Sequence, residues 1–382
     1  MQRGDRVTAS LSLRDRTRTY PGGSESVRNV AHNVRCKNDR LFSDRIVRSW
    51  EAQAFNPHPL FRNGHAQTIA AYAWPRYLST PTGDPSLERL FELEPGVRLL
   101  AHCSWQTDPV QHGTLLLVHG LEGSSGSKYM FGTAEKAFRS GFNVIRLNLR
   151  TCGGTEHLTP TLYHSGMTGD LRKVVRELIE CDRLQSIFLI GFSMGGNMVL
   201  KLAGEDADAM PGEVSGFCAV SPAIDLSSCA EAIRYRSNRV YEQYFVRSLC
   251  RRLRIKHELY PELYDTSDLH LVRTLRDFDE RYTAHDGGFK DADDYYKRAS
   301  ALPLIKRINR PTLIIHAQDD PFIPFAPFRH SSVVDNPFVV LLAPEHGGHV
   351  GFVADHVNQL DRFWAENQIV EFCQLMHQSS AL

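Results

Sequence analysis

Ser193 stands in a pentapeptide that is typical of nucleophilic catalysis by serine. The sequence Gly-Phe-Ser-Met-Gly at 191–195 follows an apolar run at 187–190 and precedes a helix-forming run at 198–203. A buried strand, a sharp turn and a helix would hold the Ser193 hydroxyl at the tip of the turn, where the glycines avoid steric crowding. Such a pentapeptide also occurs by chance, so the prediction depends on finding a base, an acid and an oxyanion site in suitable places.

Two adjacent carboxylates compete for the role of the acid. In a hydrolase of this kind the order along the chain is Ser, then Asp or Glu, then His, with the last two on loops after late strands. Asp319 and Asp320 follow an expected strand over 312–317. We choose Asp320, because Pro321 stiffens the turn after it and because Asp319 can instead cap or hydrogen-bond locally.

Two histidines in the next late loop compete for the role of the base. His346 and His349 follow an expected strand over 338–342. We choose His349, because the two glycines before it leave room for its imidazole to approach Ser193. Both loops lie at the carboxyl ends of strands, where open α/β sheets place their ligands. The predicted catalytic triad therefore consists of Ser193, Asp320 and His349.

The oxyanion that forms during acyl transfer needs two backbone N–H donors. One should belong to Met194, the residue after the nucleophile. The other should come from the loop after the expected strand over 114–118. Gly120 lets the backbone of that loop turn inward, so Leu121 is the predicted second donor. His119 precedes this glycine at the strand end, where we expect it to orient the loop rather than to take part in catalysis.

The elements that must position these loops alternate between strands and helices. An antiparallel hairpin is expected over 87–105, and repeated βα units follow it. Such repeats predict an α/β fold with a mostly parallel sheet covered on both faces, and we assign 49–221 and 303–382 to this core. The expected strands are 114–118, 143–147, 186–190, 216–220, 311–317 and 338–342, and the expected helices include 128–140 and 170–181.

The alternation breaks over 222–302, a stretch that is long, charged and aromatic. We expect a helical cap inserted over the site, because a loop of this length would be unusual without structure of its own. Basic residues on one helix of this cap could contact an anionic head group or membrane surface, although simple solvation is the alternative. The apolar positions at helical spacing are Tyr241, Tyr244, Phe245, Leu249 and Leu253, and the basic face carries Arg247, Arg251, Arg252 and Arg254.

The N-terminal part of the chain differs from the rest. Residues 1–48 are rich in Arg, Ser, Asp and Asn, which predicts a solvated, disordered tail. The interspersed acids disfavour a transit peptide, and an overextended start of the reading frame is a further interpretation. The segment 55–69 contains two prolines and should begin as an extended or turning stretch. Its His65 and Gln67 are expected to satisfy backbone groups in preference to contacting substrate.

Bulk composition disfavours several classes of protein. The 382 residues carry 44 basic and 44 acidic side chains, so a nucleic-acid partner is not expected. No apolar run reaches the ~18 residues of a membrane span, and no signal peptide is expected. The eight cysteines form no CxxC pair, which indicates free thiols in a reducing compartment and a cytoplasmic location. The histidines are not spaced as metal ligands on a helix, so no metal is expected.

Taken together, these motifs resemble the YheT-like branch of the α/β-hydrolases, also called AB hydrolase-4. The resemblance covers about residues 50–370 and leaves out the tail. It implies an α/β-hydrolase fold and a Ser-Asp-His hydrolase without a cofactor, with the catalytic roles on the three residues chosen above. The motifs are Phe-Arg-Asn-Gly-His-Ala-Gln-Thr at 61–68, His-Gly-Leu-Glu-Gly at 119–123, Tyr-His-Ser-Gly at 163–166, the stretch 191–197, Asp-Asp-Pro at 319–321, His-Gly-Gly-His-Val-Gly-Phe at 346–352, and 277–279 with 295–300 in the insertion.

The resemblance leaves the substrate open. Relatives in this branch include bacterial carboxylesterases, animal phospholipases and yeast enzymes that make medium-chain acyl ethyl esters. One loop departs from the pattern of the branch, since 149–154 reads Leu-Arg-Thr-Cys-Gly-Gly where relatives usually read Asn-Phe-Arg-Gly-Cys. We expect this loop to line the acyl pocket, so the departure bears on substrate preference and not on the triad.

The leading hypothesis is a serine carboxylesterase that cleaves small-molecule or lipid esters with a hydrophobic acyl group through an acyl-enzyme. Two alternatives keep the triad: an acyltransferase that moves the acyl group to an alcohol, and a phospholipase-like lipid hydrolase. A non-catalytic binding module with the same fold is the rival from another class. Its expected signature is a broken triad, which the intact Ser193, Asp320 and His349 oppose.

Overall fold

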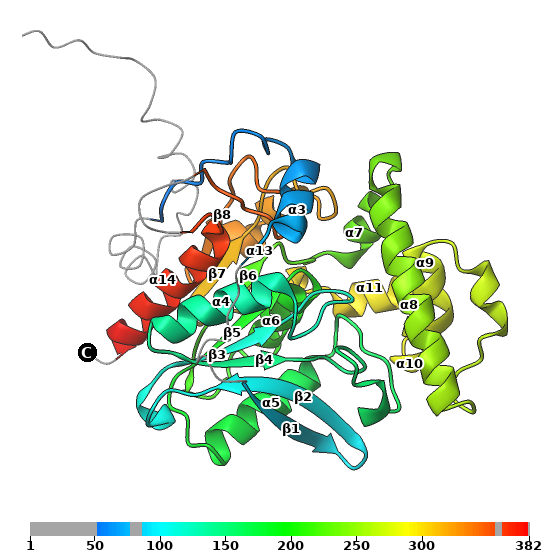
Figure 1. Ribbon diagram of the computed structural model, residues 1–382, viewed down its shortest axis with the longest axis horizontal. Coiled ribbons are helices and arrows are strands. Elements are labelled where there is room, and N and C mark those ends of the chain that lie inside the picture. Colours follow the sequence, from blue (N-terminus) through cyan, green and yellow to red (C-terminus); the bar gives the residue numbers. More distant parts are fainter. Residues whose placement is uncertain (1–51, 77–85, 356–360, 381–382) are drawn as a thin grey trace, which may run out of the picture.

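Eight strands form one sheet at the centre of the protein (Figure 1). The computed structural model describes residues 52–76, 86–355 and 361–380, so the tail predicted over 1–48 lies outside the described residues. The strand order across the sheet is β1-β2-β4-β3-β5-β6-β7-β8. The strands are β1 (Leu87–Glu94), β2 (Val97–Ser104), β3 (Thr114–Val118), β4 (Asn143–Leu147), β5 (Ile187–Phe192), β6 (Val214–Val220), β7 (Thr312–Ile315) and β8 (Val339–Leu342).

The sheet is parallel from β4 to β8 and antiparallel only at one edge. Each neighbouring pair in the series β4-β3-β5-β6-β7-β8 runs in parallel, as crossover helices require. The hairpin of β1 and β2 joins this series through an antiparallel pairing of β2 with β4. The predicted α/β fold with a mostly parallel sheet is therefore confirmed, and the expected hairpin forms its edge.

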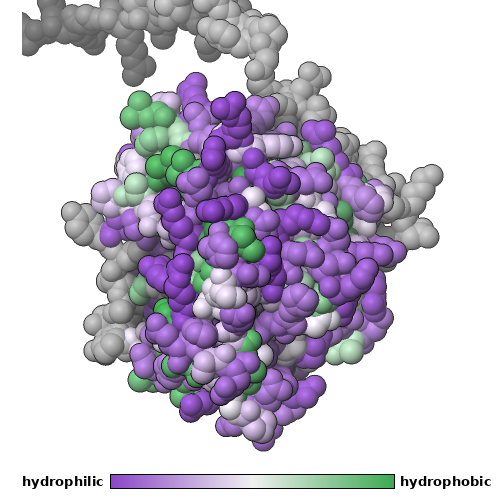
Figure 2. Space-filling model, turned by 90° about the vertical axis from the view of Figure 1, so that its right-hand side faces the viewer, coloured by the Kyte–Doolittle hydropathy of each residue, from purple (hydrophilic) through white to green (hydrophobic). Residues whose placement is uncertain are grey.

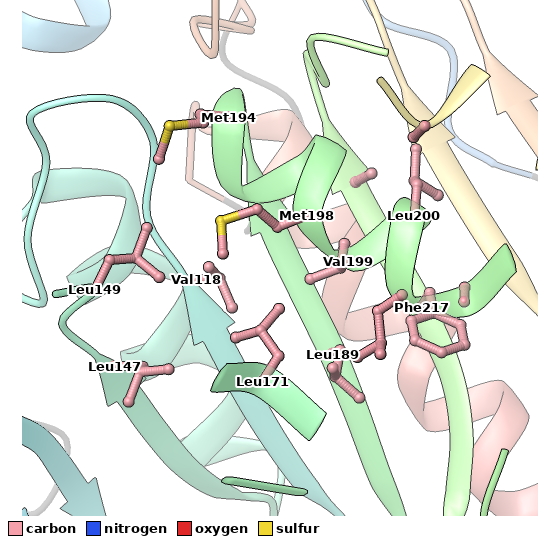
Figure 3. Packing of buried hydrophobic residues seen from close by; sticks show 14 of the residues in the cluster. Val118, Leu147, Leu149, Leu171, Leu189, Met194, Met198, Val199, Leu200 and Phe217 are labelled. Atoms are coloured by element: carbon pink, nitrogen blue, oxygen red, sulfur yellow. The ribbon is translucent and has the colours of Figure 1, made fainter. Parts of the chain in front are cut away.

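Helices cover both faces of the sheet, which explains why its inner strands are apolar along most of their length. Helices α4 (Lys128–Arg139) and α14 (Trp364–Ser380) lie on one face, and α5 (Thr168–Glu180) and α6 (Met194–Glu205) lie on the other. Figure 3 shows the second of these layers, where side chains of the strands meet those of α5 and α6. Burial of each such Leu or Val side chain contributes about 1.5–3 kcal/mol, so this packing anchors the start of α6.

Between β6 and β7 the chain leaves the sheet and forms a helical insertion beside the core (Figure 1). Its apolar residues form a small core of their own, which includes Leu249, Leu253 and Phe278. The predicted helical cap is therefore present, whereas its division from the core at 222 and 302 stays a prediction. The helices are α7 (Leu226–Ala232), α8 (Arg239–Leu259), α9 (Leu275–Phe278), a π-helix (Asp279–Thr283), α10 (Ala284–Asp286), α11 (Ala292–Ala299) and, at the return to the core, α12 (Leu302–Ile305).

Helix α8 presents a less basic outer face than its sequence suggests. Arg252 was expected on that face, but only 11% of its side chain is exposed and it pairs with Glu122 of the core. The prediction is wrong for Arg252, because a buried carboxylate draws its guanidinium inward. Tyr244 was expected on the apolar face and is instead exposed. Of the four arginines assigned to that face, Arg247, Arg251 and Arg254 are exposed. The face of the molecule that carries the cap is mostly hydrophilic (Figure 2).

Helix α3 (Gly64–Ala73) follows an extended stretch with two prolines, as the prolines predict for its start. Asn63 caps the helix, because its side-chain oxygen accepts a hydrogen bond from Ala66 N at 2.8 Å. Gln67 satisfies backbone groups as predicted, since its side chain bonds both N–H and C=O of Val353. The prediction is wrong for His65, whose ring stacks on Tyr241 of the cap.

Two findings bear on the predicted surroundings of the protein. In the described ranges, no helix is both long enough and apolar enough to cross a membrane. The seven cysteines within these ranges are free thiols, and Cys218 and Cys373 lie with their sulfur atoms 3.9 Å apart in the core. The cytoplasmic location predicted from the cysteine pattern stays a prediction.

Candidate functional site

The turn between β5 and α6 holds Ser193 in a strained backbone conformation. Its φ of 53° and ψ of −116° are unusual for a residue with a side chain, as expected for a nucleophile at a sharp strand-to-helix turn. The turn requires glycine on both sides. A Cβ on Gly191 would lie 2.2 Å from the carbonyl oxygen of Gly195, and a Cβ on Gly195 would lie 2.5 Å from that of Val118.

Two hydrogen-bonding contacts connect Ser193 to His349 and His349 to Asp320. His349 Nε2 is 2.9 Å from Ser193 Oγ, and His349 Nδ1 is 2.8 Å from Asp320 Oδ2. The other carboxylate oxygen of Asp320 accepts hydrogen bonds from Phe322 N at 2.8 Å and Ile323 N at 3.0 Å. The structure thus brings together the three residues that the sequence analysis chose.

The charge state of Asp320 follows from these contacts. Burial alone would raise the pKa of its carboxyl group, but the His349 imidazole and the Phe322 N–H together lower this pKa below its usual value. Asp320 is therefore ionised at neutral pH. An ionised carboxylate keeps the proton of His349 on Nδ1 and leaves Nε2 free to accept the proton of Ser193.

The two rejected candidates form a separate pair beside the triad. His346 Nδ1 lies 3.2 Å from Asp319 Oδ2, and Asp319 Oδ1 accepts a hydrogen bond from Gly348 N at 2.9 Å. The His346 side chain is 40% exposed, whereas that of His349 is 11% exposed. Asp319 therefore braces the histidine loop from outside, as its expected local hydrogen bonding suggests.

Two hydroxyl groups that the sequence analysis missed position the same loop. Thr68 of α3 accepts a hydrogen bond from His349 N at 2.9 Å, and Ser221 accepts one from Val350 N at 3.1 Å. Thr68 in turn donates to Gly64 O at 2.7 Å. Thr68 belongs to the quoted motif at 61–68, so the motif marked the segment although it did not reveal this role.

The loop after β3 lies against the nucleophile. A Cβ on Gly120 would stand 3.0 Å from Ser193 Cβ, so a side chain here would force the loop or Ser193 to shift. His119 orients the loop as predicted, since its ring bonds Gly120 O at 2.8 Å and accepts a hydrogen bond from Leu149 N at 3.1 Å. Burial lowers the pKa of His119 to about 4, so the ring is neutral.

The predicted oxyanion donors flank Ser193 from two elements. Leu121 and Met194 line the same cavity as Ser193. The amides on either side of Leu121 are already engaged, because Gly120 N donates to a tyrosine hydroxyl at 3.0 Å and Glu122 N donates to another at 2.9 Å. The Leu121 amide therefore lies between two amides whose positions are held by hydrogen bonds. Its assignment as a donor, like that of Met194, stays a prediction.

Glu122 joins this loop to the cap. Its φ is 55°, and its carboxylate is bonded by Arg252 Nε at 2.9 Å, by Tyr163 Oη at 2.8 Å and by the Ser248 hydroxyl. Burial acts to raise the pKa of Glu122, but the Arg252 charge and these hydrogen bonds lower it below its usual value. This cluster could not be predicted from the sequence, because its members come from segments that are far apart along the chain.

An apolar cavity opens from Ser193 toward the cap. It encloses about 1000 Å³, including the part open to solvent, and Ser193 and His349 lie in its wall. Apolar side chains of both core and cap form most of the lining, among them Leu121, Leu162, Leu226, Ile233, Phe245, Leu249, Leu275, Phe278, Phe322 and Ile323. The cavity can therefore hold a hydrophobic group next to the nucleophile.

The loop over 149–154 does not line this cavity, so that prediction is wrong. Leu149 and Cys152 are buried in the core instead. Arg150 turns away to form a bidentate ion pair with Asp170 of α5, with N–O distances of 2.6 and 2.7 Å. The departure of this loop from its relatives thus affects packing behind the site.

Comparison with known proteins agrees with this geometry. A family model described as the alpha/beta hydrolase fold matches residues 113–352, which hold the triad and the cap. The chain belongs to the α/β-hydrolase family. A YheT protein of Escherichia coli, named as a candidate esterase, is 33% identical over 323 residues, covering 83% of this chain and 92% of the relative. The predicted YheT-like branch of the family is confirmed.

Further relatives within the α/β-hydrolases differ in their named activities. A monoacylglycerol lipase of Saccharomyces cerevisiae is 31% identical over 69% of this chain and 59% of its own length. A mouse phospholipase is 28% identical over 65% and 61%. An esterase of Pyrococcus furiosus shares the fold, with a TM-score of 0.51 at 19% identity over 79% of this chain and 98% of its own.

Proposed function

We propose that Ser193, His349 and Asp320 are the catalytic triad of a carboxylic ester hydrolase that works through an acyl-enzyme. The observation that carries the proposal is the series of contacts from Ser193 Oγ through His349 to Asp320, at 2.9 and 2.8 Å, in the wall of an apolar cavity. The predicted class of enzyme, a carboxylic ester hydrolase, is confirmed by relatives named as esterase and lipase.

The geometry allows both halves of the reaction. Ser193 Oγ attacks the carbonyl carbon of the ester while His349 Nε2 takes its proton. The carbonyl oxygen becomes an oxyanion, and the N–H groups of Leu121 and Met194 each supply on the order of 3 kcal/mol of stabilisation. The C–O bond then breaks, and the leaving alcohol receives the proton from His349. A water molecule, deprotonated by His349, attacks the acyl-enzyme; the bond from the acyl carbon to Ser193 Oγ breaks, Oγ receives the proton from His349, and the acid is released.

The lining of the cavity supports a hydrophobic acyl group as the substrate. Whether water or an alcohol takes the acyl group depends only on the competition between the two at the acyl-enzyme. Product analysis with added ethanol separates the alternatives, since a pure hydrolase gives acid alone and an acyltransferase gives the ethyl ester. Phospholipid hydrolysis is the remaining alternative, supported by the mouse relative named as a phospholipase.

The decisive experiment replaces Ser193 by Ala. Turnover of a p-nitrophenyl acyl ester and labelling by a fluorophosphonate probe should both be lost, because Ser193 supplies the hydroxyl that bonds the His349 imidazole at Nε2. Ser331→Ala is the matched control, since Ser331 is exposed at the start of the remote helix α13 (Ser331–Val334) and should leave both signals unchanged. Unchanged turnover in Ser193→Ala would contradict the proposal.

A further inference from the structure

The cavity beside Ser193 carries a cluster of polar side chains that ester cleavage does not use. Asp279, Thr283 and Tyr296 all line this cavity, and all three come from the cap. They stand among apolar residues such as Leu275 and Phe278. A carboxylate among apolar side chains is costly unless it has a partner, so its retention calls for an explanation.

The carboxylate of Asp279 is only partly engaged by the protein. Tyr296 Oη donates a hydrogen bond to its Oδ2 at 2.8 Å, and the Thr283 hydroxyl bonds it as well. An ionised carboxylate can accept about four hydrogen bonds, which leaves room for a ligand. Asp279 keeps some accessible surface, and the residue lines the cavity that contains Ser193. It begins the π-helix Asp279–Thr283, a local distortion of the kind found often at functional sites.

The charges around Asp279 determine which kind of ligand its carboxylate can bind. Burial raises the pKa of Asp279 to about 6, although the hydrogen bonds from Thr283 and Tyr296 and the charge of Arg276 act to lower this pKa. At neutral pH the group is therefore mainly an ionised acceptor. A cationic ligand is disfavoured, because Arg276 already lies close enough to lower the pKa of Asp279. A neutral donor, such as a hydroxyl group, satisfies the carboxylate without adding charge.

We propose that Asp279 is a specificity-determining residue that accepts a hydrogen bond from a hydroxyl group of the ester substrate. The preferred substrates are esters that combine an apolar acyl chain with a free hydroxyl group away from the scissile bond. This inference rests on the proposed function of Ser193. A site built to bond a hydroxyl group rejects an analogue without it, because the buried polar group is then left unpaired.

The test compares two esters that differ only in hydroxyl groups, 1-decanoylglycerol and propyl decanoate. Wild type should show a kcat/KM at least roughly tenfold higher for the glyceryl ester, consistent with the loss of one hydrogen bond to a charged group. Asp279→Leu should bring this ratio close to one while the propyl ester is still cleaved. Asp279→Asn, which keeps the shape of the side chain, should reduce the ratio less. Asp268→Asn is the control, since Asp268 is an exposed residue of the cap that lies 3.5 Å from Arg281 and should leave the ratio as in wild type.

A binding measurement keeps the inference separate from catalysis. In a Ser193→Ala background, calorimetry of the same two esters should show tighter binding of the glyceryl ester, and Asp279→Leu should abolish the difference. Equal kcat/KM values for the two esters, or a preference that survives in a folded Asp279→Leu, would overturn the role of Asp279. Loss of all ester cleavage by wild type, with the binding preference intact, would instead contradict the proposed function.

Discussion

The Arg252 guanidinium of helix α8 lies 2.9 Å from the carboxylate of Glu122, the residue after the predicted oxyanion donor Leu121. The contact is buried on both sides, with 11% of the arginine side chain and 2% of the glutamate side chain exposed. It links the cap directly to the loop that must hold the oxyanion. Because Glu122 also has a φ of 55°, the pair stabilises a backbone conformation that the residue alone would disfavour.

Removal of Arg252 should therefore damage both stability and catalysis. Arg252→Met leaves the Glu122 carboxylate buried without its charged partner, which should cost about 3–5 kcal/mol of unfolding free energy. Catalysis should fall mainly in kcat, because Leu121 would be held less firmly where the oxyanion forms. Urea unfolding and kinetics with a p-nitrophenyl ester measure the two effects.

The double variant Glu122→Gln with Arg252→Met is the informative control. It removes both charges, so its unfolding free energy should lie above that of Arg252→Met alone. Additive losses in the double variant would show that the two side chains do not act as a pair.

Asp320 and Asp319 are adjacent in sequence but should respond very differently to the same substitution. Asp320→Asn removes the carboxylate that fixes the tautomer of His349, and kcat should fall by a factor on the order of 10⁴. Asp319→Asn weakens the contact with His346 and should change kcat much less. Steady-state kinetics of both variants at neutral pH distinguishes the two roles. Comparable losses would assign Asp319 a part in catalysis.

Gly195 and Gly169 offer a matched pair for the requirements of the turn at Ser193. Both lie in the first turn of a helix. An added Cβ on Gly195 would lie 2.5 Å from two backbone carbonyl oxygens, whereas one on Gly169 meets nothing within 4 Å. Gly195→Ala should therefore displace the turn and abolish activity, and Gly169→Ala should be neutral or stabilise by about 0.5–1 kcal/mol. Activity and melting temperature of the two proteins provide the measurement.

The sequence was sufficient where the physical requirement is local. The strand pattern predicted the sheet, and the choice of His349 over His346 rested on the two glycines that precede it. Contacts between distant segments were not predictable in this way. Arg252 was assigned to a solvated face because nothing near it in sequence reveals Glu122. The loop over 149–154 was assigned to the pocket because nothing near it in sequence reveals the pairing of Arg150 with Asp170.

The role of Asp279 shows the same limit. Its motif was visible in the insertion, but only the folded cap places its carboxylate in the cavity that contains Ser193. Thr68 is a similar case, since it supports His349 although the two residues are 281 positions apart in the chain. The three residues of the proposed triad could be chosen from the sequence, whereas the residues that support them and shape the cavity depend on packing.

A buried histidine behind the site should make stability depend on pH. His316 is fully buried, and its ring stacks on Phe328 with centroids 3.9 Å apart. Burial is the main cause that lowers its pKa from 6.5 to about 4. Between these two values the unfolded chain binds more protons than the native protein. The free energy of unfolding should therefore fall as the pH decreases through this window, with the contribution of His316 fully present only above about pH 6.5.

Urea unfolding at pH 7 and pH 5 tests this expectation with a variant that cannot titrate. His316→Leu keeps a similar volume, and its loss of stability between the two pH values should be smaller than that of wild type by about 2 kcal/mol. His270→Asn is the control, because His270 is exposed and should leave the wild-type pH dependence unchanged. The comparison uses the change in unfolding free energy between the two pH values, so any constant packing cost of the substitution cancels. An equal change in wild type and His316→Leu would show that the protonation of His316 is not coupled to folding.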